Sequence, residues 1–187
     1  MPNSNRPAWL LLDYLLQSSG MVVSQDIYIA APSARDVLLL NMPIFLVHKS
    51  GKLGLWLNKA MAGDYNGQLN GHDAPAPVGD CHTISIRINW PGYGEWSRPI
   101  STMEYSHKYK SMCRISLERL AELVAAAVWE FTETAGQQCR DPVWQIGGRG
   151  IRTEDINLIG LIHVCEGIWN PILQLSANRV HRRTVAR

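Results

Sequence analysis

Five residues with metal-binding side chains gather between positions 72 and 82: His72, Asp73, Asp80, Cys81 and His82. Imidazole, carboxylate and thiolate groups are ligands of zinc, which takes them in tetrahedral sets. The spacing argues against such a set, because Cys81 and His82 are adjacent and neighbouring side chains of an extended segment point to opposite faces. We therefore expect no bound metal and no cofactor.

His163 and Cys165 have a better spacing for a shared site, because residues two apart on a strand lie on the same face. Both stand inside the apolar run 156–165, however, where a buried thiol is ordinary. We interpret the pair as part of the core.

Cysteine catalysis requires a thiolate that is activated by a neighbouring base. Cys81 is the candidate nucleophile, with a distant histidine such as His107 or His163 as the base. The G-x-S-x-G and H-E-x-x-H motifs do not occur, and the glycine-rich residues 147–150 lack the spacing of a phosphate-binding loop and predict a turn. A hydrolase or transferase of unrecognised type, using Cys81 or His82, stays open as an alternative.

Aromatic residues are the better candidates for contact with another molecule. Residues 83–90 alternate between apolar and polar, which predicts a half-buried strand. Pro91 and Gly92 follow and favour a tight reversal, so we expect Tyr93 and Trp96 to point outward at one end of a sheet. Trp169, in a predicted hairpin, is the third candidate binding residue. Such rings stack on a sugar, a proline-rich peptide or a partner side chain; the alternative is that they cap the core.

Length and charge indicate one domain over residues 1–176, interrupted by a long polar loop at 64–80 and followed by a basic tail at 177–187. The net charge of the 187 residues is +2, and four arginines lie in the last nine residues. Without these arginines, 14 basic residues face 16 acidic ones, a net charge of −2. The balance does not indicate a dedicated nucleic-acid binder.

The four cysteines are widely spaced, without a C-x-x-C pair, which favours free thiols in a reducing compartment. The N-terminal apolar stretch does not read as a signal peptide, and no run approaches the roughly 18 apolar residues that span a bilayer. We therefore expect an intracellular, cytoplasmic protein without a membrane segment.

The elements that would position these residues follow from hydrophobic periodicity. We expect a short N-terminal helix around residues 9–16, strands at 26–31 and within 37–48, and a hairpin turn at 49–52. An apolar stripe with spacings of three and four predicts a long amphipathic helix at about 116–135, capped by Ser116.

The remaining C-terminal segments predict more strands. Residues 143–146 read as a short strand, 156–165 as a central strand, and 168–175 as a strand that runs back beside it after a turn at Gly167. The fold class is therefore α+β, with a mixed or antiparallel sheet, the long helix and the short N-terminal helix.

Several segments of the C-terminal half carry a family resemblance. They are Trp90-Pro91-Gly92-Tyr93 with Trp96, Ile115-Ser116-Leu117-Glu118-Arg119-Leu120-Ala121, Trp144-Gln145-Ile146-Gly147, Ile156-Asn157-Leu158-Ile159-Gly160-Leu161-Ile162-His163-Val164 and Gly167-Ile168-Trp169-Asn170-Pro171-Ile172-Leu173. Over residues 85–175 the chain resembles uncharacterised domains of mushroom-forming (basidiomycete) fungi. The resemblance implies a fungal, intracellular origin. It implies no activity and assigns no functional residue.

These observations predict a non-enzymatic interaction or structural module that self-associates through the aromatic turn, using Tyr93, Trp96 and Trp169. The apolar strands support this prediction, because their edges need cover. The partner would be a second copy or another protein, and nucleic acid would be a weaker option through the basic tail. A module for a small ligand or carbohydrate, with its site at Tyr93, Trp96 and the loop 64–80, is the main alternative.

Overall fold

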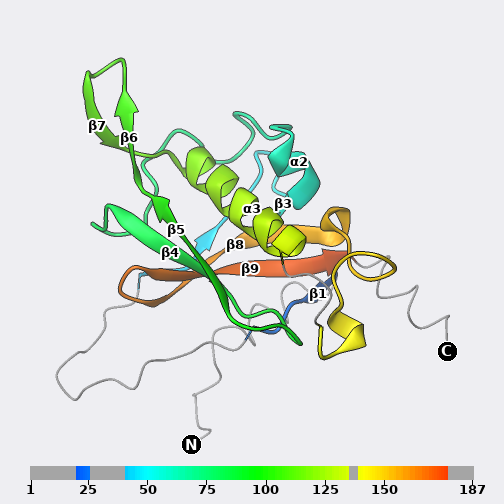
Figure 1. The fold of residues 1–187 in the computed structure, drawn as a ribbon. Coiled ribbons are helices and arrows are strands. Elements are labelled where there is room, and N and C mark those ends of the chain that lie inside the picture. The colour runs from blue at the N-terminus through cyan, green and yellow to red at the C-terminus, as the bar shows by residue number, and fades with distance from the viewer. Residues whose placement is uncertain (1–19, 26–40, 135–138, 177–187) are drawn as a thin grey trace, which may run out of the picture.

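The computed structural model describes residues 20–25, 41–134 and 139–176. At its centre is a long antiparallel hairpin formed by β8 (Ile156–Cys165) and β9 (Ile168–Ser176). Within the described residues the hairpin belongs to a seven-stranded sheet, and α3 (Leu117–Thr134), a helix of 18 residues, lies across one face of it (Figure 1). The fold is therefore α+β, as predicted.

The β8–β9 hairpin is buried on both faces. Its two strands are apolar at most positions, the pattern of a strand covered on both sides rather than on one. Leu158 and Leu173 belong to the main core, whereas Ile159 and Ile172 form a smaller cluster on the opposite face. The predicted central strand and the strand that returns beside it are both confirmed.

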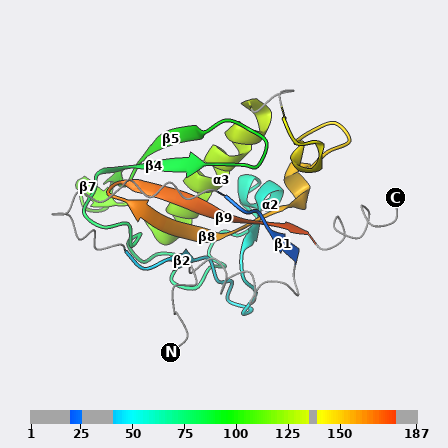
Figure 2. The ribbon, with the colours of Figure 1, turned by 90° about the horizontal axis from the view of Figure 1, so that it is seen from below.

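Shorter strands flank the two edges of the hairpin (Figure 2). Along β8, β3 (Leu55–Trp56) and β2 (Ile44–Phe45) pair in succession, and both are antiparallel. Along β9, β1 (Gly20–Val22) pairs antiparallel near its end and β4 (Thr83–Ile88) pairs parallel near its start. β5 (Trp96–Ser101) then extends the sheet beyond β4. The parallel pair makes the sheet mixed.

β4 has the alternation that its sequence predicts. Ile84, Ile86 and Ile88 are buried, while Ser85 and Arg87 between them are partly exposed. The isoleucine face lies in the main core together with the apolar stripe of α3. Because β4 is anchored in the core, it fixes where the chain enters the aromatic turn that follows.

The predicted hairpin turn at 49–52 forms as expected. His48 N–H donates to the Lys52 carbonyl oxygen over 2.8 Å, and Val47 bridges to Leu53. Gly51 takes a positive φ of 81°, which glycine adopts without steric penalty. The turn leads into β3 and then into the short helix α2 (Leu57–Met61).

The polar loop 64–80 is held against the rest of the fold by buried side chains and backbone hydrogen bonds. Leu69, Ala76 and Val78 are buried, and the Ala76 N–H donates to the Ile115 carbonyl oxygen over 2.9 Å. Glu118 Oε1 accepts from the Gly67 N–H over 2.5 Å. The loop therefore has defined positions relative to α3.

The long helix matches its predicted range and face. The buried side chains of α3 form one stripe: Leu120, Ala121, Val124, Ala125, Ala127, Val128 and Phe131. Ser116 Oγ accepts from the Arg119 N–H over 3.1 Å, as an N-terminal cap does. The stripe packs on the sheet and closes the main core.

Two expectations for local structure need correction. Residues 143–146 do not form a strand, because Pro142–Trp144 is a 3₁₀ turn capped by the Asp141 carboxylate. β5 and the separate hairpin of β6 (Met103–Ser106) and β7 (Ser111–Arg114) were not predicted from the sequence. The predicted N-terminal helix, the strand at 26–31 and the basic tail lie outside the described residues.

Replacing the central core residue of α3 tests this packing. Val124 is completely buried, so Val124→Asp would bury an unpaired carboxylate and should lower the free energy of unfolding by about 3–5 kcal/mol. Thermal denaturation followed by circular dichroism measures the effect. Asn58→Asp, at an exposed helical position, is the control and should leave the melting temperature nearly unchanged. Equal melting temperatures for the two variants would contradict the packing of α3.

Candidate functional site

Phe131, on the core side of α3, is the centre of an aromatic cluster. Its ring centroid lies 6.0 Å from that of Trp90 and 5.9 Å from those of Tyr93 and Trp96. The contacts with Tyr93 and Trp96 are edge-to-face, an arrangement that adds about 0.5–1.5 kcal/mol to the burial itself. The turn that follows β4 therefore packs toward the helix.

These contacts correct the expectation that the turn holds Tyr93 and Trp96 outward. Both side chains are partly buried and pack against the core. Tyr93 Oη accepts a hydrogen bond of 2.8 Å from the Ile146 N–H, and burial raises the pKa of the Tyr93 hydroxyl. A Cβ atom on Gly92 (φ 83°) would come within 2.8 Å of Cys139 Sγ. The turn is thus held in place by a hydrogen bond and close packing with the segment that contains Cys139 and Ile146.

Trp169 lies inside the fold. Its exposed fraction is 0%, and its ring stacks on His163 with 4.7 Å between centroids. A side chain without exposed surface offers nothing for a partner to contact. Trp169 is therefore removed from the candidate binding residues, while a binding role for the partly exposed Tyr93 and Trp96 stays a prediction.

His163 and Cys165 do not share a face. Their partners on β9 are Trp169 and Ile168, which are neighbours in sequence, because an irregularity in the pairing separates the two residues. His163 Nδ1 accepts a hydrogen bond of 2.8 Å from the Asn41 N–H, so the neutral ring carries its proton on Nε2. Burial lowers the pKa of His163, although a hydrogen bond with the Cys165 backbone opposes the shift.

Cys81 and His82 lie where the loop enters β4. Thr102 binds the backbone carbonyl groups of both, with its hydroxyl 2.5 Å from the Cys81 oxygen and its N–H 2.9 Å from the His82 oxygen. Cys81 packs partly against the core and His82 is exposed. Among the residues that the structure describes, no three His, Cys, Asp or Glu side chains gather in a group that could hold a metal ion.

The hairpin of β6 and β7, here called the arm, projects from the body of the protein (Figure 1). Its base is fixed where the chain leaves and re-enters the core, because the Ile115 N–H donates to the Thr102 carbonyl oxygen over 2.9 Å and both residues are buried. Beyond this point the two strands pair with each other and form a separate two-stranded sheet.

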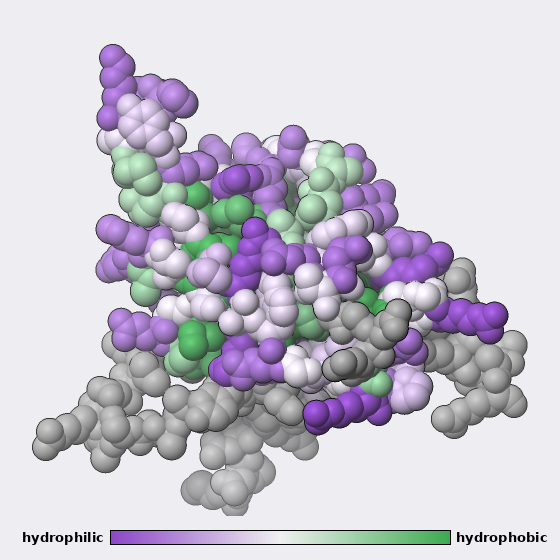
Figure 3. Space-filling model, viewed as in Figure 1, coloured by the Kyte–Doolittle hydropathy of each residue, from purple (hydrophilic) through white to green (hydrophobic). Residues whose placement is uncertain are grey.

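The arm is amphipathic. Tyr105 lies opposite Met112 and Met103 lies opposite Arg114, which gives one face an apolar character, whereas the other face carries Glu104, Ser106, Ser111 and Cys113. Tyr105, Tyr109 and Met112 are exposed by 53%, 66% and 57%. Figure 3 shows the resulting hydrophobic surface on the arm below a hydrophilic tip. An apolar face at this exposure is unusual, because an amphipathic element normally buries it.

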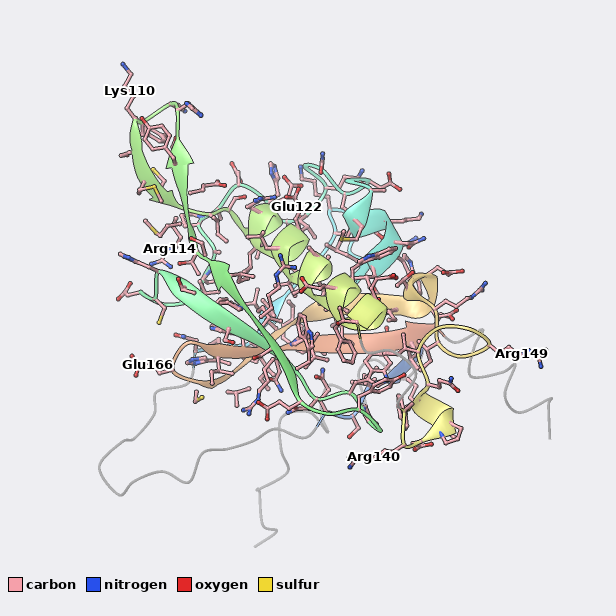
Figure 4. The ribbon with its side chains drawn as sticks, in the orientation of Figure 1. Lys110, Arg114, Glu122, Arg140, Arg149 and Glu166 are labelled. Carbon is pink, nitrogen blue, oxygen red and sulfur yellow. The ribbon has the colours of Figure 1, made fainter. Side chains whose placement is uncertain are left out.

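The tip of the arm is basic. His107, Lys108, Tyr109 and Lys110 form the loop between the strands, and Lys108 Nζ lies 5.1 Å from the centre of the Tyr109 ring. Lys110 occupies the far end of the arm and Arg114 lies at its base (Figure 4). Carboxylates stand near the base: Asp80 pairs with Arg114 at 3.9 Å, and Glu104 with Arg119 at 4.0 Å.

Sequence reasoning missed the arm because its turn has none of the usual signals. The loop between β6 and β7 contains neither glycine nor proline, and Lys110 instead adopts the left-handed conformation with φ 52°. Alternation does exist in Met103-Glu104-Tyr105-Ser106, but four residues are a short window. The second strand, Ser111–Arg114, also has only four residues, and the long helix begins soon after it at Leu117.

Comparisons with known proteins do not supply a function. No family model, curated protein or solved structure matches the chain. Within the described residues, no helix is both long enough and apolar enough to cross a membrane.

Removing the hydroxyl group of Tyr93 tests how the aromatic turn is held. Tyr93→Phe keeps the ring contact with Phe131 but leaves the Ile146 N–H without its acceptor, so the free energy of unfolding should fall by about 1–3 kcal/mol. Chemical denaturation measures this difference. Tyr109→Phe, in the exposed loop of the arm, is the matched control and should have no effect. A Tyr93→Phe variant as stable as the control would show that the hydrogen bond does not hold the turn.

The pKa of His163 predicts a loss of stability in mild acid. Because the folded-state pKa is lower than the ordinary 6.5, the unfolded chain binds the proton more readily, and stability should decrease as the pH falls below about 6.5. Melting temperatures between neutral pH and mildly acidic pH should show this slope, and His163→Gln should flatten it. The exposed His82→Gln variant should keep it. A slope unchanged in His163→Gln would contradict the assignment.

Proposed function

We propose that the chain is a non-enzymatic interaction module that self-associates, and that the arm is its contact element. The observation that supports this proposal most is the exposed apolar face formed by Tyr105 and Met112 on a projecting hairpin. An isolated two-stranded hairpin is marginally stable in water. A hairpin with an exposed apolar face and free strand edges gains stability when another surface covers it.

A second copy of the chain fits the charge distribution of the arm. If two arms pair antiparallel about a twofold axis, the tip of each lies beside the base of the other. The tip carries Lys108 and Lys110, and the base carries the carboxylates of Asp80 and Glu104. Within one chain these carboxylates face Arg114 and Arg119, so in the pair of arms the tip lysines would share them with those arginines. The small net charge of +2 adds little repulsion between copies.

The same arrangement assigns the apolar residues of the arm to the centre of the interface. Tyrosine is a frequent interface anchor, because its rigid ring loses little side-chain entropy on contact and covers a large area. Two arms would contribute two copies each of Tyr105, Tyr109 and Met112. This moves the proposed contact from the turn at Tyr93 and Trp96, where the rings already pack on Phe131, to side chains that the core does not use.

Analytical ultracentrifugation tests the proposal. The wild-type chain should show concentration-dependent association, and Tyr105→Ser with Met112→Ser should weaken it roughly thirtyfold or more, as loss of an anchor of about 2 kcal/mol does. The control is Met61→Ser with Val143→Ser, which removes two exposed apolar side chains outside the arm and should associate like the wild type. Circular dichroism verifies that all three proteins are folded.

Two results would overturn the proposal. A wild-type chain that stays monomeric at all accessible concentrations excludes self-association. A double arm variant that associates as strongly as the control shows that the interface lies elsewhere. Retention of the wild-type monomer on an oligonucleotide would indicate nucleic acid as the partner instead.

A further inference from the structure

A groove with a volume of about 780 Å³ lies beside β3, at the end of the sheet that carries the turn 49–52. Its volume falls in the range of sites that bind small molecules, roughly 300–1,000 Å³. The turn, β3 with the start of α2, the loop after α2 and the central hairpin each contribute residues to it. This groove is built from parts of the chain that the arm does not include.

The floor of the groove is a row of polar and aromatic residues across three strands. Trp56 on β3 pairs with Asn157 on β8, which pairs with Gln174 on β9, so the three side chains point to the same face. Asn157 is only 7% exposed, and its Oδ1 atom has no hydrogen-bond partner within residues 20–25, 41–134 and 139–176. Buried polar atoms are normally satisfied. An unpaired acceptor at the floor of a groove therefore indicates a missing donor.

Gly54 allows this arrangement. A Cβ atom at this position would lie 2.7 Å from Asn157 Oδ1, and its φ of 85° is one that other residues rarely adopt. The backbone can therefore pass close to the amide, and Asn157 Nδ2 donates over 3.5 Å to the Leu53 carbonyl oxygen. That long contact leaves Oδ1 as the buried amide atom without a partner among the described residues.

One wall of the groove is fixed by a chain of hydrogen bonds. His48 Nδ1 accepts from the Ser50 N–H over 3.1 Å, so its Nε2–H donates to Gln68 Oε1 over 2.7 Å. Gln68 Nε2 then donates over 2.9 Å to the carbonyl oxygen of Asp64. This chain ties the loop to the turn 49–52, and the wall is formed before any ligand arrives, which reduces the entropic cost of binding.

The charged and aromatic lining defines a ligand class. Lys52 and Lys59 line the groove and form no ion pair among the described residues, whereas Asp64 is the carboxylate that lines it. Two ammonium groups against one carboxylate favour an anion. Trp56 and Tyr65 supply ring surfaces of the kind on which sugars and bases stack.

We propose that this groove binds a phosphorylated sugar, either free or as the ribose phosphate of a mononucleotide. The phosphate lies between Lys52 and Lys59, because ammonium groups bind phosphate as point charges. A sugar hydroxyl donates to Asn157 Oδ1 at the floor once the Gly54 backbone, which packs against this fully buried atom, moves aside. The ring of the ligand packs on Trp56, whose backbone N–H is held by the Tyr65 hydroxyl over 3.1 Å.

Isothermal titration calorimetry with the full chain tests this site against four probes: ribose 5-phosphate, adenosine monophosphate, ribose and inorganic phosphate. We expect ribose 5-phosphate to bind with a millimolar or tighter dissociation constant. Binding of adenosine monophosphate with higher affinity would identify the nucleotide as the source, and weaker binding would identify the free sugar phosphate. Neither ribose nor inorganic phosphate should reach the affinity of the better phosphorylated sugar.

Matched charge variants locate the binding. Lys52→Gln with Lys59→Gln should weaken binding at least roughly tenfold, because it removes two charge-assisted contacts. Arg140→Gln with Arg149→Gln removes the same charge from a surface outside both the groove and the arm and should bind like the wild type. Both pairs are exposed, so folding is preserved, and circular dichroism checks it.

Three results would overturn the inference. No heat of binding with either phosphorylated sugar excludes the ligand class. Equal affinity for inorganic phosphate reduces the site to an adventitious ion only. Equal loss in the groove variant and in the arginine control shows that net charge, rather than the groove, attracts the anion. The oligomeric state is measured separately, so failure of this inference leaves the proposed role of the arm unaffected.

Discussion

The pairing of β8 with β9 is the interaction on which the rest of the structure depends. Each shorter strand of the main sheet pairs directly with one of these two strands, except β5, which pairs with β4. One face of the hairpin shares the main core with α3, and the other supplies Asn157 and Gln174 to the groove. Burial on both faces makes its apolar residues a large source of stability, because roughly 25 cal/mol is gained for each Å² of apolar surface removed from water. Its polar side chains are unfavourable there unless they form hydrogen bonds, because burying an amide without a partner costs free energy.

Phe131 has a comparable role on the helix side of the core. Three aromatic rings from the turn after β4 meet it, and Trp90 Nε1 also donates over 2.9 Å to the Trp144 carbonyl oxygen. Gly92 accepts a hydrogen bond of 2.8 Å from the Arg140 N–H. The turn therefore joins the helix to the segment that precedes β8. Rings used in this way stabilise the fold, and the surface available for partners is provided by other elements.

The sequence predicts those parts of the fold in which one periodicity runs over many residues. The alternation of residues 83–88, the stripe of α3 and the apolar runs of β8 and β9 each define a buried face without knowledge of the rest of the chain. Whether Tyr93 and Trp96 point inward could not be predicted in this way, because it depends on the distant Phe131 and Ile146. A strict period of two would likewise place Cys165 on the same face as His163, but the irregular pairing between them places Cys165 on the other face. The groove is less predictable still, because its lining comes from four segments and because the lack of a partner at Asn157 Oδ1 among the described residues depends on the three-dimensional fold.

The loop 64–80 explains why the groove and the arm have defined positions in one small fold. It begins with Asp64, Tyr65 and Gln68 in the groove wall, and it ends with Asp80, which pairs with Arg114 at the base of the arm. Between these points Glu118 of α3 binds the Gly67 N–H, and the buried side chains of Leu69 and Val78 attach the loop to the core. A loop of this composition would be mobile if it had no such contacts. Its hydrogen bonds to the helix and the hairpin turn give it fixed ends, so substitutions inside the loop would disturb both surfaces together. Substitutions at Lys52 and Lys59, or at Tyr105 and Met112, affect one surface each, because those side chains lie outside the loop and are not part of the buried core.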